Sequence, residues 1–205
     1  PYQDEQRIHI TAWRAEDIRS FDRAIHGHPT IICFEGGEDF PYTSLDALYA
    51  ALATLPALES VRLATLRVRQ ADETNLANPE SLTELLQVPY LRCVCFDHFP
   101  FTRALCQATA NALTEGTAIT KLEFNECSFS VEGSAVMMAN GLSRNTSVSH
   151  VKVVSSRDQA LFGVLATALP SNSTLRRLDL HWKEKGDSAH LSPILLALVK
   201  NTGVN

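Results

Sequence analysis

One short segment, Cys93-Val94-Cys95-Phe96-Asp97-His98, gathers side chains of the kinds that bind metal ions or act as nucleophiles. In an extended strand alternate residues share a face, so Cys93, Cys95 and Asp97 would be adjacent ligands. Structural zinc normally takes four ligands, often as two separated pairs, and no second Cys/His cluster in the sequence completes this set. We therefore predict neither a metal nor another cofactor.

A cysteine nucleophile needs a nearby base and a group that orients it. Lys121 or His150 could approach the segment from neighbouring strands, but a sheet face with mixed side chains offers no evident pocket for a substrate. Cys106 and Cys127 fall on core positions, where a thiol packs as a small hydrophobic group. We predict that the chain is not an enzyme.

Two segments match the acceptor pattern for N-glycosylation, Asn145-Thr146-Ser147 and Asn172-Ser173-Thr174. Both stand where a predicted helix ends, and so does Asn201-Thr202-Gly203, which is not an acceptor. Because asparagine tolerates the left-handed conformation that caps a helix, we interpret all three as helix-ending turns.

The elements that carry these residues repeat along the chain. Six leucines each stand six residues before an aliphatic residue: Leu52, Leu85, Leu113, Leu142, Leu169 and Leu198. Their partners are Leu58, Leu91, Ile119, Val148, Leu175 and Val204, which are 33, 28, 29, 27 and 29 residues apart. Such a period is typical of a stacked array, in which each unit buries its apolar face against its neighbours.

Each unit is predicted to contain one strand and one helix. Apolar residues stand three and five positions after the aliphatic anchor, as Leu122 and Phe124 do after Ile119, and so share one face of a strand. Thirteen, nine and six positions before the anchor, apolar residues recur at helical spacing, and Leu195 is one of these predicted core positions.

The first part of the chain is less regular. We assign residues 1–57 to irregular N-terminal repeats or a cap of the array, with strands near residues 7–10 and 31–34 and a helix near residues 18–25. Residues 58–205 form the regular repeats of what we predict to be one continuous solenoid, interrupted by a bulging loop from Arg67 to Pro79.

The pattern Leu-x-x-Leu-x-Leu followed by a helix, in units of 27 to 29 residues, resembles leucine-rich repeats. The length is similar to the ribonuclease-inhibitor-like subclass, as in the arrays of NOD-like receptors and Ran GTPase-activating proteins. The best match is the segment 119–129, with Cys127 at the family's Asn/Cys position. Other units carry at this position Leu66, Phe99, Ser156 and Lys183. We therefore expect less regular loops after those strands.

The resemblance implies an α/β fold, a curved right-handed solenoid with parallel strands on the concave side and helices on the convex side. It also implies a non-catalytic module for protein–protein interaction that binds a protein partner on its concave surface. The residues predicted to contact this partner are Arg62, Asp97, Lys121, Glu123, Asn125, His150, Lys152, Arg177, Asp179 and His181. Charges of both signs mix there, and strands about 4.8 Å apart would let many of them neutralise one another.

Composition limits the other classes of function. Of 205 residues 45% are hydrophobic and 20% are charged, as in an ordinary folded protein, and the net charge of −5 argues against nucleic-acid binding. Five cysteines without a disulfide framework favour a reducing compartment, so we expect a cytoplasmic protein. No apolar run approaches the roughly 18 to 20 residues of a membrane span. The chain begins at Pro1 without methionine, and we expect it to be part of a longer protein.

Two alternatives to a simple binding module remain open at this point. The similarity to Ran GTPase-activating proteins allows a regulator of a small GTPase. A sensor or targeting array of an immune receptor, a ubiquitin ligase or a pathogen effector is the other, and its partner could be other domains of the same polypeptide. Binding at the loops or the rim, through Arg67, Arg69 or Trp182, is the alternative to the concave surface.

Overall fold

The computed structural model describes residues 7–12, 30–36, 45–65, 79–129, 133–155, 160–182 and 192–201. The helix predicted near residues 18–25, most of the bulging loop after Arg67 and the last anchor, Val204, lie outside the described residues. So do Leu66, Ser156 and Lys183, and of Trp182 only the backbone is described.

The strands form one parallel sheet in the order β1-β2-β3-β4-β6-β8-β9. Their bounds are Arg7–Ala12 (β1), Ile31–Gly36 (β2), Ser60–Thr65 (β3), Cys93–Asp97 (β4), Lys121–Asn125 (β6), His150–Ser155 (β8) and Arg177–Trp182 (β9). Since neighbours in the sheet follow one another along the chain, the polypeptide advances by one strand per unit.

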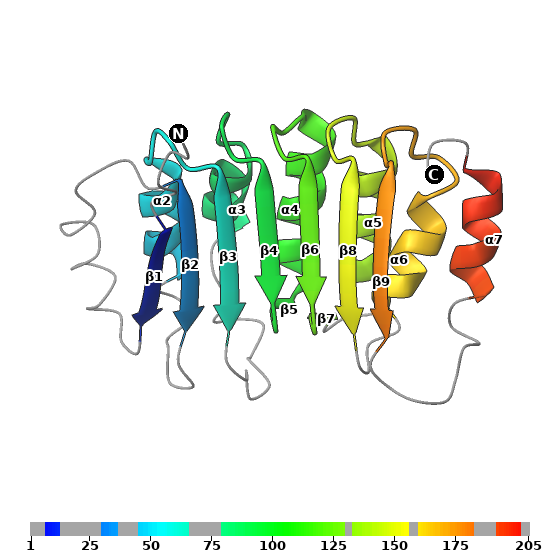
Figure 1. Cartoon of the computed structure of the whole chain (residues 1–205), viewed down its shortest axis with the longest axis horizontal. Coiled ribbons are helices and arrows are strands. Elements are labelled where there is room, and N and C mark those ends of the chain that lie inside the picture. The colour runs from blue at the N-terminus through cyan, green and yellow to red at the C-terminus, as the bar shows by residue number, and fades with distance from the viewer. Residues whose placement is uncertain are drawn as a thin grey trace, which may run out of the picture.

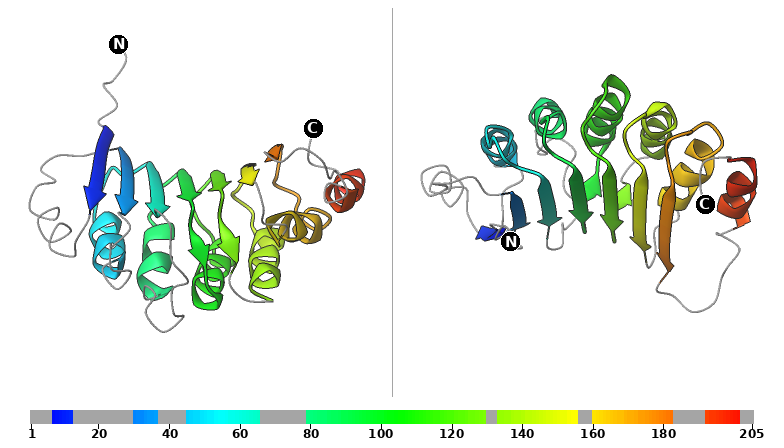
Figure 2. Two further views of the ribbon diagram at one scale, coloured as in Figure 1. Left: turned by 90° about the horizontal axis from the view of Figure 1, so that it is seen from below. Right: turned by 45° about the horizontal axis from the view of Figure 1, so that its top comes forward.

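The described helices all lie on one face of this sheet (Figure 1). They are α2 (Leu45–Ala53), α3 (Pro79–Leu86), α4 (Arg103–Glu115), α5 (Ser134–Arg144), α6 (Ala160–Ala168) and α7 (Ser192–Lys200). Seen along the strands, the sheet lines the inside of a shallow arc and the helices line the outside (Figure 2). The predicted fold class is confirmed: alternating parallel strands and helices form a curved α/β solenoid, consistent with leucine-rich repeats.

The core is built from rows of side chains that run across the strands. The register aligns Val61, Val94, Leu122 and Val151 in one such row, all at most 1% exposed. The anchors Leu58, Leu91, Ile119, Val148 and Leu175 form another buried row beside it. Successive units therefore bury the same positions against each other, which is why the sequence repeats in phase.

Three asparagine side chains join the C-terminal units, each by a hydrogen bond to a backbone carbonyl of the preceding unit. Asn145 Nδ2 donates to the Leu113 carbonyl at 2.9 Å, and Asn172 Nδ2 donates to the Leu142 carbonyl at 2.7 Å. Asn201 Nδ2 donates to the carbonyl of Asn172 at 2.6 Å. We call Asn145, Asn172 and Asn201 the asparagine ladder. These residues are at most 9% exposed, and their side chains donate to backbone carbonyls at or just after helix ends, where the helical hydrogen-bond pattern stops.

The ladder confirms turns at these positions but corrects their predicted conformation. Asn145 has φ −68° and ψ 138°, which is extended and not left-handed. Its Oδ1 accepts from the backbone N–H groups of Ser147 and Val148 at 3.0 and 2.6 Å, so the side chain itself closes the turn. The Nδ2 atom, to which a glycan would be attached, is buried and already donates a hydrogen bond, which also argues against N-glycosylation at this asparagine.

A small two-stranded sheet, β5 (Pro100–Phe101) and β7 (Ser128–Phe129), follows β4 and β6 and was not predicted. Phe101 stands at its centre, with ring centroids 5.0 Å from those of both Phe96 and Phe99 and 5.3 Å from that of Phe129. Phe99, at the family's Asn/Cys position, is buried in this aromatic cluster. The loop is therefore held by ring packing where an Asn would hold it by hydrogen bonds.

The prediction that Leu195 lies in the core is wrong. Leu195 is 59% exposed on α7, while Ile194 and Ala197 are buried instead. The equivalent Ala110 and Ala139 are buried, and Ala110 lies directly against the next helix, at Gly141. No helix lies beyond α7 in the described part of the chain, so Leu195 has no such neighbour.

Candidate functional site

The concave face of the sheet carries three rows of outward side chains. The register aligns Cys93, Lys121, His150 and Arg177 in the first row, and Arg62, Cys95, Glu123, Lys152 and Asp179 in the second. Asp97, Asn125, Val154 and His181 follow in the third. All ten predicted contact residues therefore lie on this one face, which we call the concave stripe.

Three carboxylates organise the charges of the concave stripe, and each has two basic neighbours. Asp97 pairs with the Arg62 guanidinium on β3, and the Nε2 atom of His98 is 3.7 Å from its other oxygen. The Asp97 side chain is only 9% exposed. Asp97 thus lies on the predicted face but beneath its surface, because Arg62 covers it.

Glu123 on β6 binds two lysines. Lys121, two residues earlier on the same strand, forms an ion pair with one carboxylate oxygen, and Lys152 Nζ on β8 lies 3.5 Å from the other. Burial acts to raise the pKa of Glu123, but the hydrogen bond and charge of Lys121 and the charge of Lys152 outweigh it and hold this pKa below its usual value. The same hydrogen bond raises the pKa of Lys121.

Asp179 on β9, the last strand of the described sheet, is the third carboxylate. Arg177 Nε donates to both of its oxygens, at 3.1 and 3.0 Å, and His150 Nε2 lies 2.9 Å from Oδ2. The hydrogen bonds from Arg177 and His150 lower the pKa of Asp179 to about 2. Strand pairing places His150 directly beside Arg177, so both bases reach one acid.

The ion pairs with lysine and arginine are layered, with the acid below and the base above, whereas His150, at 20% exposed, is no more exposed than Asp179. The Asp97, Glu123 and Asp179 side chains are 9, 14 and 25% exposed. Their partners Arg62, Lys121, Lys152 and Arg177 are 52, 36, 33 and 68% exposed. Lysine and arginine stems are long enough to lie over a shorter acid while their charged ends stay in water. The outermost charges of the stripe are therefore basic, although positive and negative charges nearly balance.

The cysteines of the stripe are poorly suited to nucleophilic chemistry. Burial raises the pKa of Cys93, and it raises the pKa of Cys95 to about 12. A nucleophilic cysteine needs the opposite shift, toward the thiolate at neutral pH. Cys106 and Cys127 are buried in the core, as predicted, and Cys127 Sγ donates to the Phe96 carbonyl at 3.4 Å.

The potential metal ligands of the segment 93–98 already have protein partners. Asn125 Nδ2 donates to Cys95 Sγ at 3.3 Å, and the Asp97 carboxylate is held by Arg62 and His98. Among the described residues no group of three or more His, Cys, Asp or Glu side chains could hold a metal ion. Likewise, no described helix has the length and apolar character to cross a membrane.

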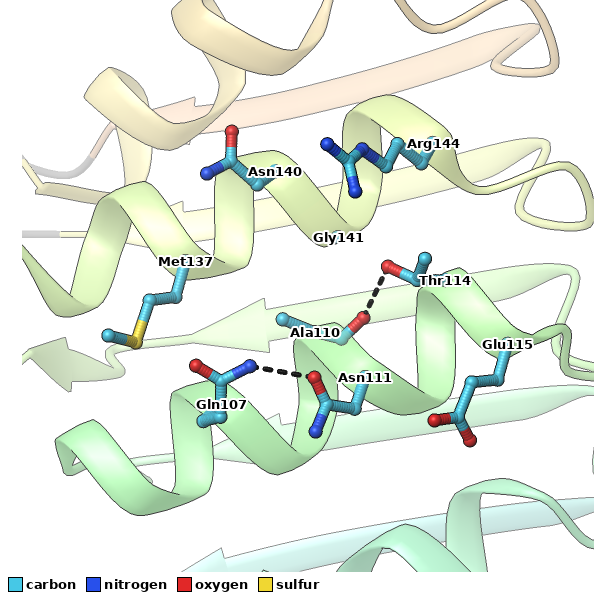
Figure 3. Close-up of a pocket in the computed structure, with 9 residues that line it drawn as sticks. All are labelled: Gln107, Ala110, Asn111, Thr114, Glu115, Met137, Asn140, Gly141 and Arg144. Atoms are coloured by element: carbon cyan, nitrogen blue, oxygen red, sulfur yellow. Dashed lines mark hydrogen bonds between the residues drawn. The ribbon is translucent and has the colours of Figure 1, made fainter.

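A groove of about 220 Å³ runs between α4 and α5 on the convex side (Figure 3). Ala110 and Gly141, which have almost no side chain, line it at the point where the two helices are in direct contact. Its walls are polar, and Gln107 donates to Asn111 within α4 at 2.7 Å. We attribute the groove to close helix packing.

Sequence reasoning missed the backbone conformation that ends the central strands. Among the described non-glycine residues, only His98 and Glu126 have positive φ, 51° and 50°. Their N–H groups donate to the carbonyls of Asn125 and Val154 on the next strand, both at 2.7 Å. Histidine and glutamate are not the usual residues for this conformation, so their types did not predict a positive φ at these positions.

No protein-family model matches the chain, and no curated protein matches it. Among solved structures it is similar to one described as leiomodin-1 actin-binding site 2, at 14% sequence identity and a TM-score of 0.43. The alignment covers 91% of this chain and 86% of that one.

Proposed function

We propose that this chain is a non-catalytic interaction module that binds a protein partner, or another domain of the same polypeptide, on its concave stripe. The observation that carries the proposal is the ordered charge layer on β3 to β9. Four basic side chains are presented to solvent there, each positioned by a carboxylate beneath it. Pre-positioned side chains lose less conformational freedom on binding, which favours a recognition surface.

The repeat architecture suits this function. A solenoid offers a long concave surface whose outward residues can vary without disturbing the core, because core and surface positions alternate along each strand. The spacing of 27 to 29 residues in the regular units supports assignment to the ribonuclease-inhibitor-like subclass of leucine-rich repeats. The raised pKa values of Cys93 and Cys95 favour a binding role over a thiol enzyme.

The test compares two double variants with equal changes in charge. Lys152→Glu with Arg177→Glu reverses two bases at the centre of the stripe. Arg103→Glu with Arg144→Glu reverses two exposed bases on α4 and α5, on the convex side. Circular dichroism and a thermal melt establish that both variants are folded. Affinity capture with quantitative mass spectrometry then identifies proteins bound by the wild type.

We expect a genuine partner to bind the wild type and the convex variant alike. The concave variant should bind it at least ~10-fold more weakly in titration calorimetry, since reversed charges at a desolvated contact are strongly unfavourable. Equal loss in both variants would contradict the proposal. Loss only on changing Arg67 and Arg69 to glutamate would move the site to the loop after β3.

A further inference from the structure

We propose that the partner segment of the concave stripe is acidic: an extended stretch of polypeptide rich in Asp and Glu that crosses the strands from β3 to β9. This inference rests on the proposed function and specifies its partner. It follows from the difference between the total charge of the stripe and the charge that it shows to solvent.

The total charge is close to neutral. Arg62, Lys121, Lys152 and Arg177 contribute four positive charges, and Asp97, Glu123 and Asp179 contribute three negative ones. With neutral histidines the sum is +1 on a chain whose net charge is −5. The sum alone would predict no preference for a charged partner.

Depth within the surface changes this conclusion. All three acids are at most one quarter exposed, and all four bases are at least one third exposed. A partner therefore approaches the bases first, and the acids act on it only from behind them. The attraction between unit charges falls with distance, so the nearer layer dominates the field at contact.

The bases also retain donors for a partner. A lysine ammonium has three donors and an arginine guanidinium has five. Lys121 and Lys152 each make one contact with Glu123. Arg177 contacts Asp179 through Nε and one terminal nitrogen. A carboxylate of the partner can bind the remaining N–H groups without breaking these pairs. Each base would then lie between its own carboxylate and that of the partner, with charge-assisted hydrogen bonds to both.

The same surface fits an acidic polypeptide better than a nucleic acid. Nucleic-acid binding usually uses a clustered excess of basic residues and aromatic rings on which bases stack. Among the described side chains of the concave face there is no Phe, Tyr or Trp ring, since the described phenylalanines of β2, β4 and β6 point into the core. The excess of bases over acids is a single charge.

The dimensions set the length of the segment. From β3 to β9 there are four steps between neighbouring strands, or about 19 Å at the usual spacing. An extended polypeptide crosses this distance with roughly six residues. A probe of about ten residues is therefore long enough to reach every base of the stripe.

The experiment measures binding of a fluorescein-labelled peptide of alternating Glu and Ser by fluorescence anisotropy. The matched probes are the same peptide with Gln in place of Glu, and a single-stranded oligonucleotide of equal charge. We expect the Glu peptide to bind at least ~10-fold more tightly than the Gln peptide, with an affinity that falls as salt rises. A Gln peptide that binds equally well, or an oligonucleotide that binds more tightly, would overturn the acidic assignment.

Two variants should then change this affinity in opposite directions. Lys152→Glu with Arg177→Glu should weaken binding at least ~10-fold. Glu123→Gln removes the acid beneath Lys121 and Lys152 without removing either base, so it should strengthen binding by about threefold or more. Damage to the fold would weaken binding in both, so the opposite signs separate charge recognition from structural loss. The convex variant Arg103→Glu with Arg144→Glu should leave the affinity unchanged.

Failure of this inference can be distinguished from failure of the proposed function. If the captured protein partner is lost with the concave variant but the Glu peptide does not bind, the concave site stands and the acidic class is wrong. If neither the partner nor the peptide responds to the concave variant, both proposals fail.

Discussion

Gly141 on α5 lies directly against the backbone of Ala110 on α4. A Cβ atom added to Gly141 would lie 2.6 Å from Cα and 2.8 Å from the carbonyl oxygen of Ala110. The close approach of these two helices thus requires a glycine, although glycine is a poor helix former.

Gly141→Ala should lower the free energy of unfolding by about 1 to 3 kcal/mol, the usual cost of forcing an extra methyl group into a packed contact. Gly163→Ala is the matched control, because Gly163 is also helical but has no atom within 4 Å of its added Cβ. There the better helix propensity should raise stability by about 0.5 to 1 kcal/mol. Urea denaturation measures both, and a stabilised Gly141→Ala variant would show that the helices can move apart freely.

Asn172→Ala should destabilise the chain by about 1 to 3 kcal/mol, because it removes the buried side-chain hydrogen bonds to the Leu142 carbonyl and to the N–H of Leu175. Asn140→Ala, on the exposed face of α5, should change stability by less than ~0.5 kcal/mol. Equal effects in thermal melts would show that the ladder adds nothing beyond an ordinary surface turn.

Asn172→Asp should be more harmful at pH 8 than at pH 4. The new carboxylate would face the Leu142 carbonyl inside the protein, so its pKa in the folded state should lie above that of the unfolded chain. Folding then takes up a proton, and stability falls as the pH rises through the folded-state pKa. Chemical denaturation at both pH values measures the difference, and a variant equally stable at both would place the side chain in water.

Asp179 should make the opposite contribution to acid sensitivity. Its folded-state pKa of about 2 lies below the value of about 3.9 expected in an unfolded chain. The stabilisation is complete above the unfolded-state pKa and is lost as the pH falls toward the folded-state value. Asp179→Asn should therefore flatten the fall in melting temperature between about pH 4 and pH 2. An unchanged slope would show that the pairs with Arg177 and His150 do not form in solution.

Phe101→Ala should cost about 3 to 5 kcal/mol, because the ring fills the centre of the cluster formed by Phe96, Phe99 and Phe129. Tyr90→Ala removes a ring that is 57% exposed and should cost much less. If the two variants melt at the same temperature, the aromatic cluster does not stabilise the loops after β4 and β6.

Periodicity predicted the repeating units because it arises from burial, which the solenoid repeats identically in each unit. The leucines six residues before the anchors are buried from Leu52 to Leu169, and the outward positions of the strands are those predicted. The prediction for Leu195 was wrong because a side chain is buried only where a neighbouring element covers it. The type of one residue does not show whether a helix lies beside it. The position of Glu123 beneath Lys121 and Lys152 could likewise not be predicted from the residue types. A sequence gives the face on which a charge lies but not its depth.

The asparagine ladder also limits how such an array can be lengthened or rearranged. In the earlier units the position of Asn145 and Asn172 is occupied by Leu55, Val88 and Gly116, none of which can hydrogen-bond through a side chain. A duplicated asparagine unit inserted beside Asn172 would meet a carbonyl that it can bind, and would pass one on to the next unit. A copy of an earlier unit in the same place would lack the side-chain donor that binds the buried carbonyl of the unit before it. We therefore expect the asparagine units to exchange with one another at less cost in stability than with the units before them.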